Sequence, residues 1–241
     1  MRRLACASIL FAALLATGCA SQPTSAKRDA RDPFERVNRA SFAFNDTLDR
    51  AILKPTAKGY RAVAPQFLET GVSNFFDNLD TPKTLVNDLL QAKFKPALHD
   101  TGRLLLNTTI GLGGLFDPAS AAGLDRNEED FGQTLGKWGV PAGPYLMIPF
   151  VGPSTVRDGC GEIPDEFTDP RHYVERDKVR FGILFVNLLD SRARQLSLED
   201  TLNSAYDKYG FIRNAYLQRR EYLVTDGEVP EESLEDPEAG Q

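Results

Sequence analysis

One stretch of the chain is as long as a membrane span and carries no charge, yet its composition rules out a spanning helix. Trp138 to Val156 are 19 consecutive uncharged residues. They contain four prolines and three glycines, namely Pro141, Pro144, Pro149 and Pro153 with Gly139, Gly143 and Gly152. Proline removes a backbone donor and glycine weakens a helix. Irregular backbone at membrane depth needs protein or a water-filled cavity to satisfy its polar groups. The stretch therefore predicts a folded-back hairpin at an interface or lining a passage.

The first residues predict a secretory signal. Arg2 and Arg3 form a positive start, and Leu4 to Leu15 form the apolar segment that such signals carry. Leu15-Ala16-Thr17-Gly18-Cys19 is similar to the lipobox of bacterial lipoproteins, which are cut before the cysteine and acylated on it. Ala16 stands where a large aliphatic residue is usual, and the alternative is an ordinary signal that leaves Cys19 unmodified. We expect a signal peptide at 1–18 and a lipidated Cys19, whose acyl chains would anchor the protein permanently.

The residues after Cys19 indicate where the anchor lies. Ala20, Ser21 and Gln22 lack the aspartate that keeps similar bacterial lipoproteins in the inner membrane, which favours the outer membrane. Residues 19–31 are rich in small and polar side chains and are typical of a flexible tether.

The opposite end of the chain holds most of its excess negative charge. Residues 226–241 contain seven acids, two prolines and no base, which predicts a disordered, solubilising tail; a docking role is the alternative. The whole chain has a net charge of -6 and is too acidic to favour nucleic acid as a partner. Without the signal and the tail, residues 19–225 hold 26 bases and 27 acids, so the chain apart from its two ends is nearly neutral, with the expected folded body at 32–225.

The body has the pattern of amphipathic helices. Asp32, Pro33 and Glu35 form a typical capped helix start, and apolar residues then recur at helical spacing through Ile52. Phe42 lies off this stripe, which indicates either a second packing contact or contact with lipid. Further helices are expected over 65–79, from a restart at Thr81-Pro82 through 90, and over 95–105, 179–189 and 202–223. No stretch alternates with period two, so the predicted fold class is all-α.

The residue types needed for catalysis or metal binding are sparse. The chain has three cysteines and two histidines, without a Cys-x-x-Cys pair, so we expect no metal site and no cofactor. Gly111-Leu112-Gly113-Gly114 lacks the strand and the Lys-Ser/Thr of a phosphate loop. Cys160 could act as a nucleophile if His99 or His172 activated it, but a structural or incidental cysteine is the stronger interpretation. We expect no catalytic residue.

The last predicted helix places arginines and tyrosines on one broad face. Arg213 and Arg220 align there with three tyrosines, an arrangement suited to phospholipid headgroups. The alternative is that both arginines pair with acids elsewhere in the fold or extend to water.

Many short motifs, in one register from Asp32 to Leu223, together resemble the MlaA (VacJ) family of outer-membrane lipoproteins. They include Asp32-Pro33-Phe34-Glu35, Asn38-Arg39, Phe44-Asn45, Ser73-Asn74-Phe75, Asn87, Gln91, Asn107 to Gly114, Phe131 to Gly136, Trp138-Gly139-Val140, Gly143-Pro144-Tyr145, Pro149, Gly152 to Thr155 and Arg157-Asp158.

This resemblance implies a ring-like bundle of amphipathic helices, embedded in the periplasmic leaflet of the outer membrane, with an amphipathic passage. Proteins of this family remove phospholipids that have strayed into the outer leaflet and pass them to a soluble periplasmic carrier. They also associate with trimeric porins. The family pattern implies a hairpin from Gly139 to Pro149 beside the passage, with Gly143, Pro144 and Tyr145 at its tip. It further implies that Gly111, Gly113 and Gly114 provide close packing or movement nearby.

Two other functions stay open on the sequence alone. One is a membrane-lipid hydrolase that uses Cys160 with a histidine. The other is a structural lipoprotein that scaffolds porins.

Overall fold

The computed structural model describes residues 29–228. The expected signal peptide, Cys19, and nearly all of the tether and the acidic tail lie outside the described residues. The chain divides into a unit that ends at Ala30 and a main unit that begins at Arg31. The elements of the main unit are α2 (Glu35–Leu48), the π-helical η1 (Asp49–Leu53), α3 (Lys54–Val63), α4 (Gln66–Leu90), α5 (Phe94–Thr109), α6 (Pro118–Ala121), α7 (Phe131–Lys137), β1 (Tyr145–Ile148), β2 (Gly152–Thr155), α8 (Val156–Thr168), the 3-10 turn η2 (Pro170–Tyr173), α9 (Asp177–Arg194), the 3-10 turn η3 (Gln195–Leu198), α10 (Glu199–Ser204) and α11 (Lys208–Val224).

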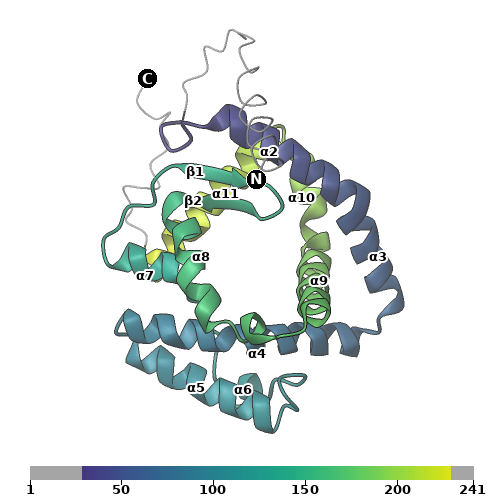
Figure 1. The fold of residues 1–241 in the computed structure, drawn as a ribbon, viewed down its shortest axis with the longest axis vertical. Coiled ribbons are helices and arrows are strands. Elements are labelled where there is room, and N and C mark those ends of the chain that lie inside the picture. Colours follow the sequence, from purple (N-terminus) through teal and green to yellow (C-terminus); the bar gives the residue numbers. More distant parts are fainter. Residues whose placement is uncertain (1–28, 229–241) are drawn as a thin grey trace, which may run out of the picture. The chain divides into compact units, whose positions relative to one another are not determined.

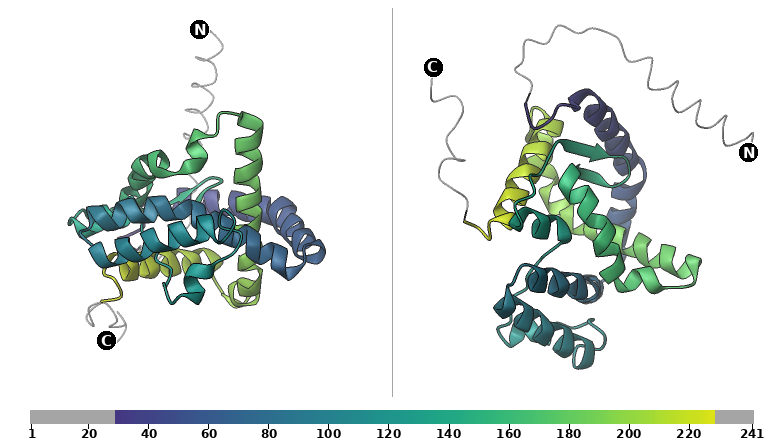
Figure 2. Two further views of the ribbon diagram at one scale, coloured as in Figure 1. Left: turned by 90° about the horizontal axis from the view of Figure 1, so that it is seen from below. Right: turned by 60° about the vertical axis from the view of Figure 1, so that its left-hand side comes forward.

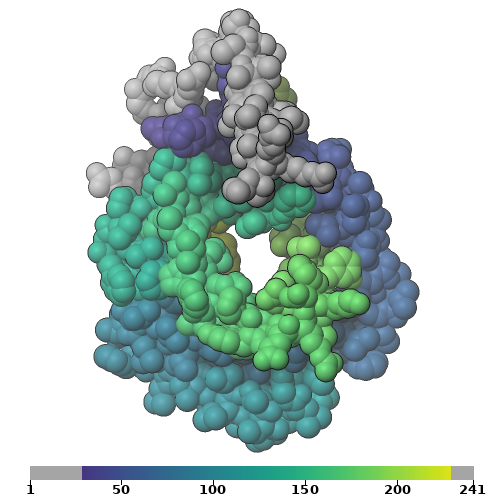
Figure 3. Space-filling view, in the orientation of Figure 1, coloured from purple at the N-terminus to yellow at the C-terminus, as the bar shows by residue number. Residues whose placement is uncertain are grey.

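The elements of the main unit form a ring around a central opening. Helix α9 contacts α3 and α4, and α8 contacts α4 and β2, while β1 lies against α2 (Figure 1). The opening persists in the space-filling view, where α8 and α9 border it (Figure 3). Helices α5 and α6 lie on the side of α4 away from the opening. Figure 2 shows α8 and α9 rising to one face of the ring and α11 lying toward the other.

Apolar and polar side chains are distributed in the reverse of the usual globular arrangement. Among the described residues, eight apolar side chains are buried, against eighteen polar or charged ones. On α9 the exposed Phe181, Leu184, Phe185 and Leu188 share one face. Other strongly exposed apolar side chains are Val63, Phe67, Phe94, Leu98, Ile110, Phe150 and Val151. Ordinary globular domains keep exposed apolar patches small. The ring therefore exposes many apolar side chains, while its buried positions are occupied largely by polar or charged side chains.

The all-α prediction is confirmed apart from the small hairpin β1–β2. Its antiparallel register pairs Tyr145 with Thr155 and Ile148 with Gly152. The folded-back conformation expected of the uncharged stretch is thus a β-hairpin, although the stretch lacks period-two alternation. Within residues 29–228, no helix combines the length and apolarity needed to cross a membrane.

Three local predictions differ from the structure. Asp32 does not cap α2: the N-cap is Phe34, and the Asp32 side chain is buried and bonded elsewhere. Helix α4 runs through Pro82 without a restart, because packing against α5, α8 and α9 along its length outweighs the local penalty of about 3 kcal/mol. The helix expected over 202–223 is broken, since Ala205 is extended and Asp207 turns the chain by bonding to Arg39 at 2.7 and 3.0 Å.

Candidate functional site

The outer edge of β1 is completed by side chains of α2 instead of by another strand. The buried Asn38 donates its Nδ2 to the carbonyl of Tyr145 at 3.0 Å and accepts from the N–H of Met147 at 2.9 Å. The N–H of Tyr145 also donates to the carbonyl of Arg31, at 2.8 Å. One side-chain amide thus takes the place of a neighbouring peptide group.

A second asparagine repeats this pairing two turns further along α2. Asn45 donates its Nδ2 to the carbonyl of Ile148 at 3.0 Å and accepts from the N–H of Phe150 at 2.8 Å. Asn38 and Asn45 are seven residues apart, so they lie on one helix face roughly 10 Å from each other. The helix therefore supports the hairpin at two levels.

The base of the hairpin is fixed in a small aromatic core. Tyr145 and Met147 pack with Tyr209 of α11, and all three are buried. Phe42 also packs here, with its ring centroid 5.9 Å from that of Tyr209. Of the two roles expected for Phe42, a second packing contact is therefore the one that the structure shows. Burial, with the nearby Asp32 carboxylate, raises the pKa of Tyr145 to about 12.

Asp32 is the polar centre of this base. Its Oδ1 accepts from Asn38 Nδ2 at 2.7 Å, and its Oδ2 accepts from the hydroxyl of Tyr209 and from Arg213 at 3.2 Å. A buried carboxylate is stable only when it is paired and hydrogen-bonded. Asp32 thus joins the start of α2, the hairpin and α11.

The structure places the hairpin tip away from the expected residues. Tyr145 begins β1, and the pairing of Ile148 with Gly152 leaves Pro149, Phe150 and Val151 as the connecting turn. Phe150 and Val151 are each 73% exposed, while Tyr145 is fully buried. The residues expected at the tip, Gly143, Pro144 and Tyr145, therefore form the base of the hairpin, and of the residues expected in the hairpin Pro149 lies closest to the tip.

The segment before β1 makes the turn that feeds the hairpin. Gly139 and Gly143 have φ values of +89° and +69°, a region that favours glycine. A Cβ on Gly143 would lie 3.3 Å from the Cβ of Val156. Val156 N donates to the carbonyl of Pro144 at 3.1 Å, which closes the base of the hairpin against the start of α8.

The two arginines proposed for headgroups are engaged by carboxylates. Arg213 pairs with Asp32 as described, and its side chain is 13% exposed. Arg220 binds Asp130 at 2.6 and 2.9 Å and Asp158 at 3.0 Å from both Nε and Nη2. This is the arrangement that the alternative interpretation of the helix face expected.

The Arg220 network links three elements of the ring. Burial alone would raise the pKa of Asp130, but the Arg220 guanidinium brings it down to about 2. Asp158 also accepts from Arg157 at 2.9 Å and from the hydroxyl of Tyr216 at 2.8 Å. Burial would raise its pKa, but Arg220 above all, with Tyr216 and Arg157, lowers it. The network joins the start of α7, the start of α8 and the end of α11.

Helices α7 and α8 approach so closely that side chains are excluded between them. A Cβ on Gly161 would lie 2.5 Å from the backbone nitrogen of Gly132. A Cβ on Gly132 would lie 2.7 Å from Asp158 Oδ1 and 2.8 Å from Arg220 Nη2. The Phe131 to Gly136 motif therefore brings backbone up to the ion-pair network.

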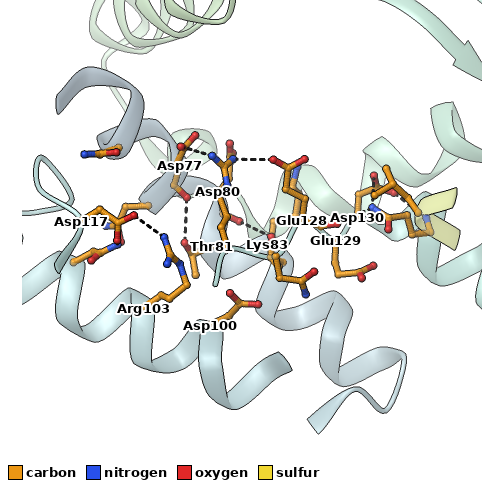
Figure 4. A pocket seen from close by; sticks show the side chains of 18 of the residues that line it. Asp77, Asp80, Thr81, Lys83, Asp100, Arg103, Asp117, Glu128, Glu129 and Asp130 are labelled. Carbon is orange, nitrogen blue, oxygen red and sulfur yellow. Dashed lines mark hydrogen bonds and ion pairs between the residues drawn. The ribbon is translucent and has the colours of Figure 1, made fainter. Parts of the chain in front are cut away.

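A polar cavity of about 340 Å³ lies between α4, α5, the 124–130 segment and α11. Figure 4 shows charged side chains from these elements facing one another across it. Opposite charges pair within it: Arg103 with Asp117 at 3.0 Å, Arg126 with Glu128 at 3.2 Å, and Arg220 with Asp130. The glycine-rich turn after α5 packs nearby, with Gly114 against Asn78 of α4. The internal pairing gives this cavity a structural role in joining the helices.

Beside this cavity, two carboxyl groups interact with each other. Asp88 of α4 and Asp100 of α5 are buried, with 0% and 2% exposure. Burial, reinforced by a hydrogen bond with Asp100, raises the pKa of Asp88 to about 8. Asp88 therefore keeps its proton at neutral pH, which avoids repulsion between two buried carboxylates where α4 meets α5.

The candidate nucleophile Cys160 lies on α8, and the candidate histidine His172 lies in η2. Cys160 is exposed on α8. His172 Nδ1 lies 3.0 Å from Glu166 Oε1, and its ring packs against Phe167 and Tyr173. No group of three or more His, Cys, Asp or Glu side chains within the described part of the chain is arranged to hold a metal ion.

The sequence did not predict the roles of Asn38 and Asn45 in supporting the hairpin. The available signal was their seven-residue spacing on a helix, which places two amides on one face beside an aromatic stripe. Asn87 was also missed as a junction: it donates to Asp165 at 2.8 Å and accepts from Thr134 at 2.7 Å, linking α4, α8 and α7.

Comparisons with known proteins cover the whole ring. The family model described as MlaA lipoprotein matches residues 30–223. The chain is 35% identical over 237 residues to the intermembrane phospholipid transport system lipoprotein MlaA of Escherichia coli (strain K12), covering 96% of this chain and 93% of that protein. It is 36% identical over 199 residues to an uncharacterized protein of Rickettsia bellii (strain RML369-C), covering 82% of this chain and 78% of that protein. A solved structure concerned with the structural basis for maintenance of bacterial outer membrane lipid asymmetry matches with a TM-score of 0.73 and 36% identity, covering 82% of this chain and 100% of that one.

Proposed function

Because this chain belongs to the MlaA lipoprotein family, we propose that it removes mislocalised phospholipids from the outer leaflet of the outer membrane and thereby maintains lipid asymmetry. The Escherichia coli relative is named as a lipoprotein of an intermembrane phospholipid transport system. The related solved structure concerns outer membrane lipid asymmetry. In this proposal the protein is a conduit and not an enzyme.

The observation that carries the proposal is a ring with a central opening, in which apolar side chains are exposed and polar side chains are buried. Large apolar side chains are exposed on several helices, whereas the buried positions among the described residues are mostly polar or charged. Such an exterior is stable against acyl chains. A charged headgroup at bilayer depth is costly unless it has a wet path, and an opening within a polar-cored ring would supply one.

We place the ring in the periplasmic leaflet of the outer membrane. The described helices are too short or too polar to span a bilayer, which agrees with a body that lies within one leaflet. Lipidation of Cys19 would hold it there, since acyl chains add roughly 0.8 kcal/mol of membrane affinity per buried methylene.

Two partners complete the pathway. A trimeric porin would hold the ring in the membrane through its exposed apolar faces, such as that of α9. A soluble periplasmic carrier would receive the phospholipid from the opening. Both partners are carried over from the family resemblance.

The mechanism needs no chemical energy at this protein. A phospholipid would enter from the outer leaflet, pass its headgroup through the opening and keep its tails near hydrocarbon. The hairpin borders the route, because it lies on the ring between α2 and α8 (Figure 1). An opening closed to the inner leaflet would give the transfer its direction.

A substitution at the base of the hairpin tests this function in cells. Gly143→Ala places a Cβ at a φ of +69° and 3.3 Å from Val156, which should displace the hairpin. We expect it to change the amount of phospholipid in the outer leaflet, measured by labelling of surface-exposed headgroups. Gly59→Ala on α3 is the control, since a Cβ there meets nothing within 4 Å. Equal outer-leaflet phospholipid in both variants would count against a conduit controlled by the hairpin.

A further inference from the structure

The two amide supports of the hairpin differ in how firmly they are held. Asn38 is 2% exposed, is bonded to the buried Asp32, and supports strand residues that lie in the aromatic core. Asn45 is only half-buried, and it supports the turn, where Phe150 is 73% exposed. The base of the hairpin is therefore fixed, whereas its tip depends on a few accessible contacts.

The tip also carries backbone strain. Phe150 has a φ of +67°, in the left-handed region that a bulky side chain rarely adopts. Two contacts hold it there: its N–H donates to Asn45 at 2.8 Å, and its ring lies edge-on to that of Phe44, with centroids 5.0 Å apart. Both contacts come from α2. Loss of the Asn45 contact would let Phe150 relax to an ordinary conformation, so the strain favours release of the tip.

The hairpin edge has no neighbouring strand to retain it after such a release. The backbone of its outer edge is bonded to the side-chain amides of Asn38 and Asn45 on α2, and Tyr145 N donates to the carbonyl of Arg31, which precedes α2. That last bond lies at the base, next to Asn38. The fold therefore has a pivot at Asn38 and a latch at Asn45.

We propose that Asn45 is a positioning residue that latches the hairpin tip to α2, and that its release lets the tip swing about Asn38 and change the width of the passage. The link to passage width rests on the function proposed above. The latch itself rests only on the hydrogen bonds, the burial difference and the strained Phe150.

A distance measurement on the full-length lipoprotein in mild detergent tests the latch. Spin labels are placed at Val151 on the tip and at the exposed Lys58 on α3, in a Cys160→Ser background. The parent should give one narrow distance distribution by double electron–electron resonance. Asn45→Ala should add a second population that is at least threefold larger than any in the parent. An unchanged distribution in Asn45→Ala would overturn the latch.

Two further variants separate positioning from general loss of structure. Asn45→Asp keeps an acceptor for the Phe150 N–H but loses the donor to Ile148, so its second population should be smaller than that of Asn45→Ala. Asn203→Ala on α10 removes an exposed hydrogen bond with Lys208. Its distance distribution should match that of the parent. If Asn45→Ala does not fold, the Asn45→Asp distribution decides: a second population supports the latch, and the parent's distribution overturns it.

Phospholipid transfer tests whether Asn45 controls the passage. Transfer of fluorescent phosphatidylethanolamine from the purified protein to acceptor vesicles should change at least threefold in Asn45→Ala and remain unchanged in Asn203→Ala. A tip that moves while the transfer rate stays constant would refute control of the passage by Asn45. If the parent itself carries no phospholipid, the proposed function fails, while the distance measurement still decides whether the latch exists.

Discussion

Removal of Arg220 should destabilise the ring strongly, because this one side chain pairs with two carboxylates, one partly buried and one buried. Arg220→Met leaves Asp130 and Asp158 without their main cation, and their side chains are only 24% and 7% exposed. The pKa of Asp130 is about 2, against an ordinary value of 3.8. That difference corresponds to about 2.4 kcal/mol at neutral pH. With Asp158 included, the loss should reach the ~3–5 kcal/mol typical of breaking a buried ion pair.

Thermal unfolding in mild detergent provides the assay. Trp138 is the single tryptophan, and its ring lies 5.8 Å from that of Phe131 at the start of α7, so its fluorescence reports on this junction. For a domain of this size, ~3–5 kcal/mol corresponds to a fall in Tm of roughly 6–20 °C. The stability from Asp130 is present above its unfolded pKa, near 4, and is lost as pH falls toward 2. The difference between Arg220→Met and the parent should therefore narrow in acid.

The neighbouring arginine supplies a matched control. Arg219 is 66% exposed and pairs with Glu128 at 3.0 Å, so Arg219→Met should cost no more than about 1 kcal/mol. Adding Asp130→Asn to Arg220→Met should recover part of the loss, because it removes one unpaired buried charge. If Arg220→Met unfolds at the temperature of Arg219→Met, the network does not hold α7, α8 and α11 together.

Three further predictions concern other parts of the chain. Gly161→Ala should lower stability by about 1–3 kcal/mol in thermal unfolding, because the new Cβ would meet the Gly132 backbone at 2.5 Å; a stability equal to that of Gly59→Ala would contradict this. Asp88 has a raised pKa, so its stabilising effect is complete below pH 4 and is lost as pH rises through about 8. Asp88→Asn should remove a pH dependence of stability of up to about 1.4 kcal/mol per pH unit, and parallel pH profiles of stability for the variant and the parent would refute the raised pKa of Asp88. Cys19→Ala should release the protein from the membrane fraction and change its gel mobility, and no change in either would argue against lipidation.

The sequence predicted the helical class and the approximate positions of α2, α4, α5, α9 and α11, because the relevant forces are local, but it did not predict α3, α6, α7 or α8. Helices α4, α5 and α9 follow from apolar residues at helical spacing, and α4 and α5 also from the prolines Pro65 and Pro96 near their starts. The hairpin followed from four prolines and three glycines in an uncharged stretch. Its tip could not be placed this way, since the strand register depends on contacts with α2 that no local pattern reveals.

Polar residues on helix faces were the main source of error. Asp32 had the local signature of an N-cap, but tertiary pairing with Asn38 and Arg213 gave the carboxylate a buried role instead. Ser73 bonds to Asp190 of α9 at 3.0 Å, and Gln91 bonds to Glu129 at 2.7 Å. Such polar contacts between distant segments leave no periodic signal, although the motif residues that resemble the MlaA family include Ser73 and Gln91.

The apolar helix faces were visible in the sequence, but the sequence did not show whether they would be buried or exposed. A stripe such as that on α9 predicts a buried face in an ordinary globular protein. Here Phe181 is 65% exposed and Phe185 is 49% exposed. In the folded ring these side chains stay accessible, and most of the buried positions among the described residues are polar or charged.

The proposal that phospholipid passes through the ring is tested most directly by mass spectrometry of lipid bound to the full-length protein. The protein is purified in mild detergent, its phospholipids are quantified, and their transfer to acceptor vesicles is followed over time. We expect phospholipid at about one molecule per protein, released to acceptor at a rate that Gly143→Ala alters and Gly59→Ala does not. Protein that carries no phospholipid, or that transfers it equally in both variants, would contradict a conduit through the ring.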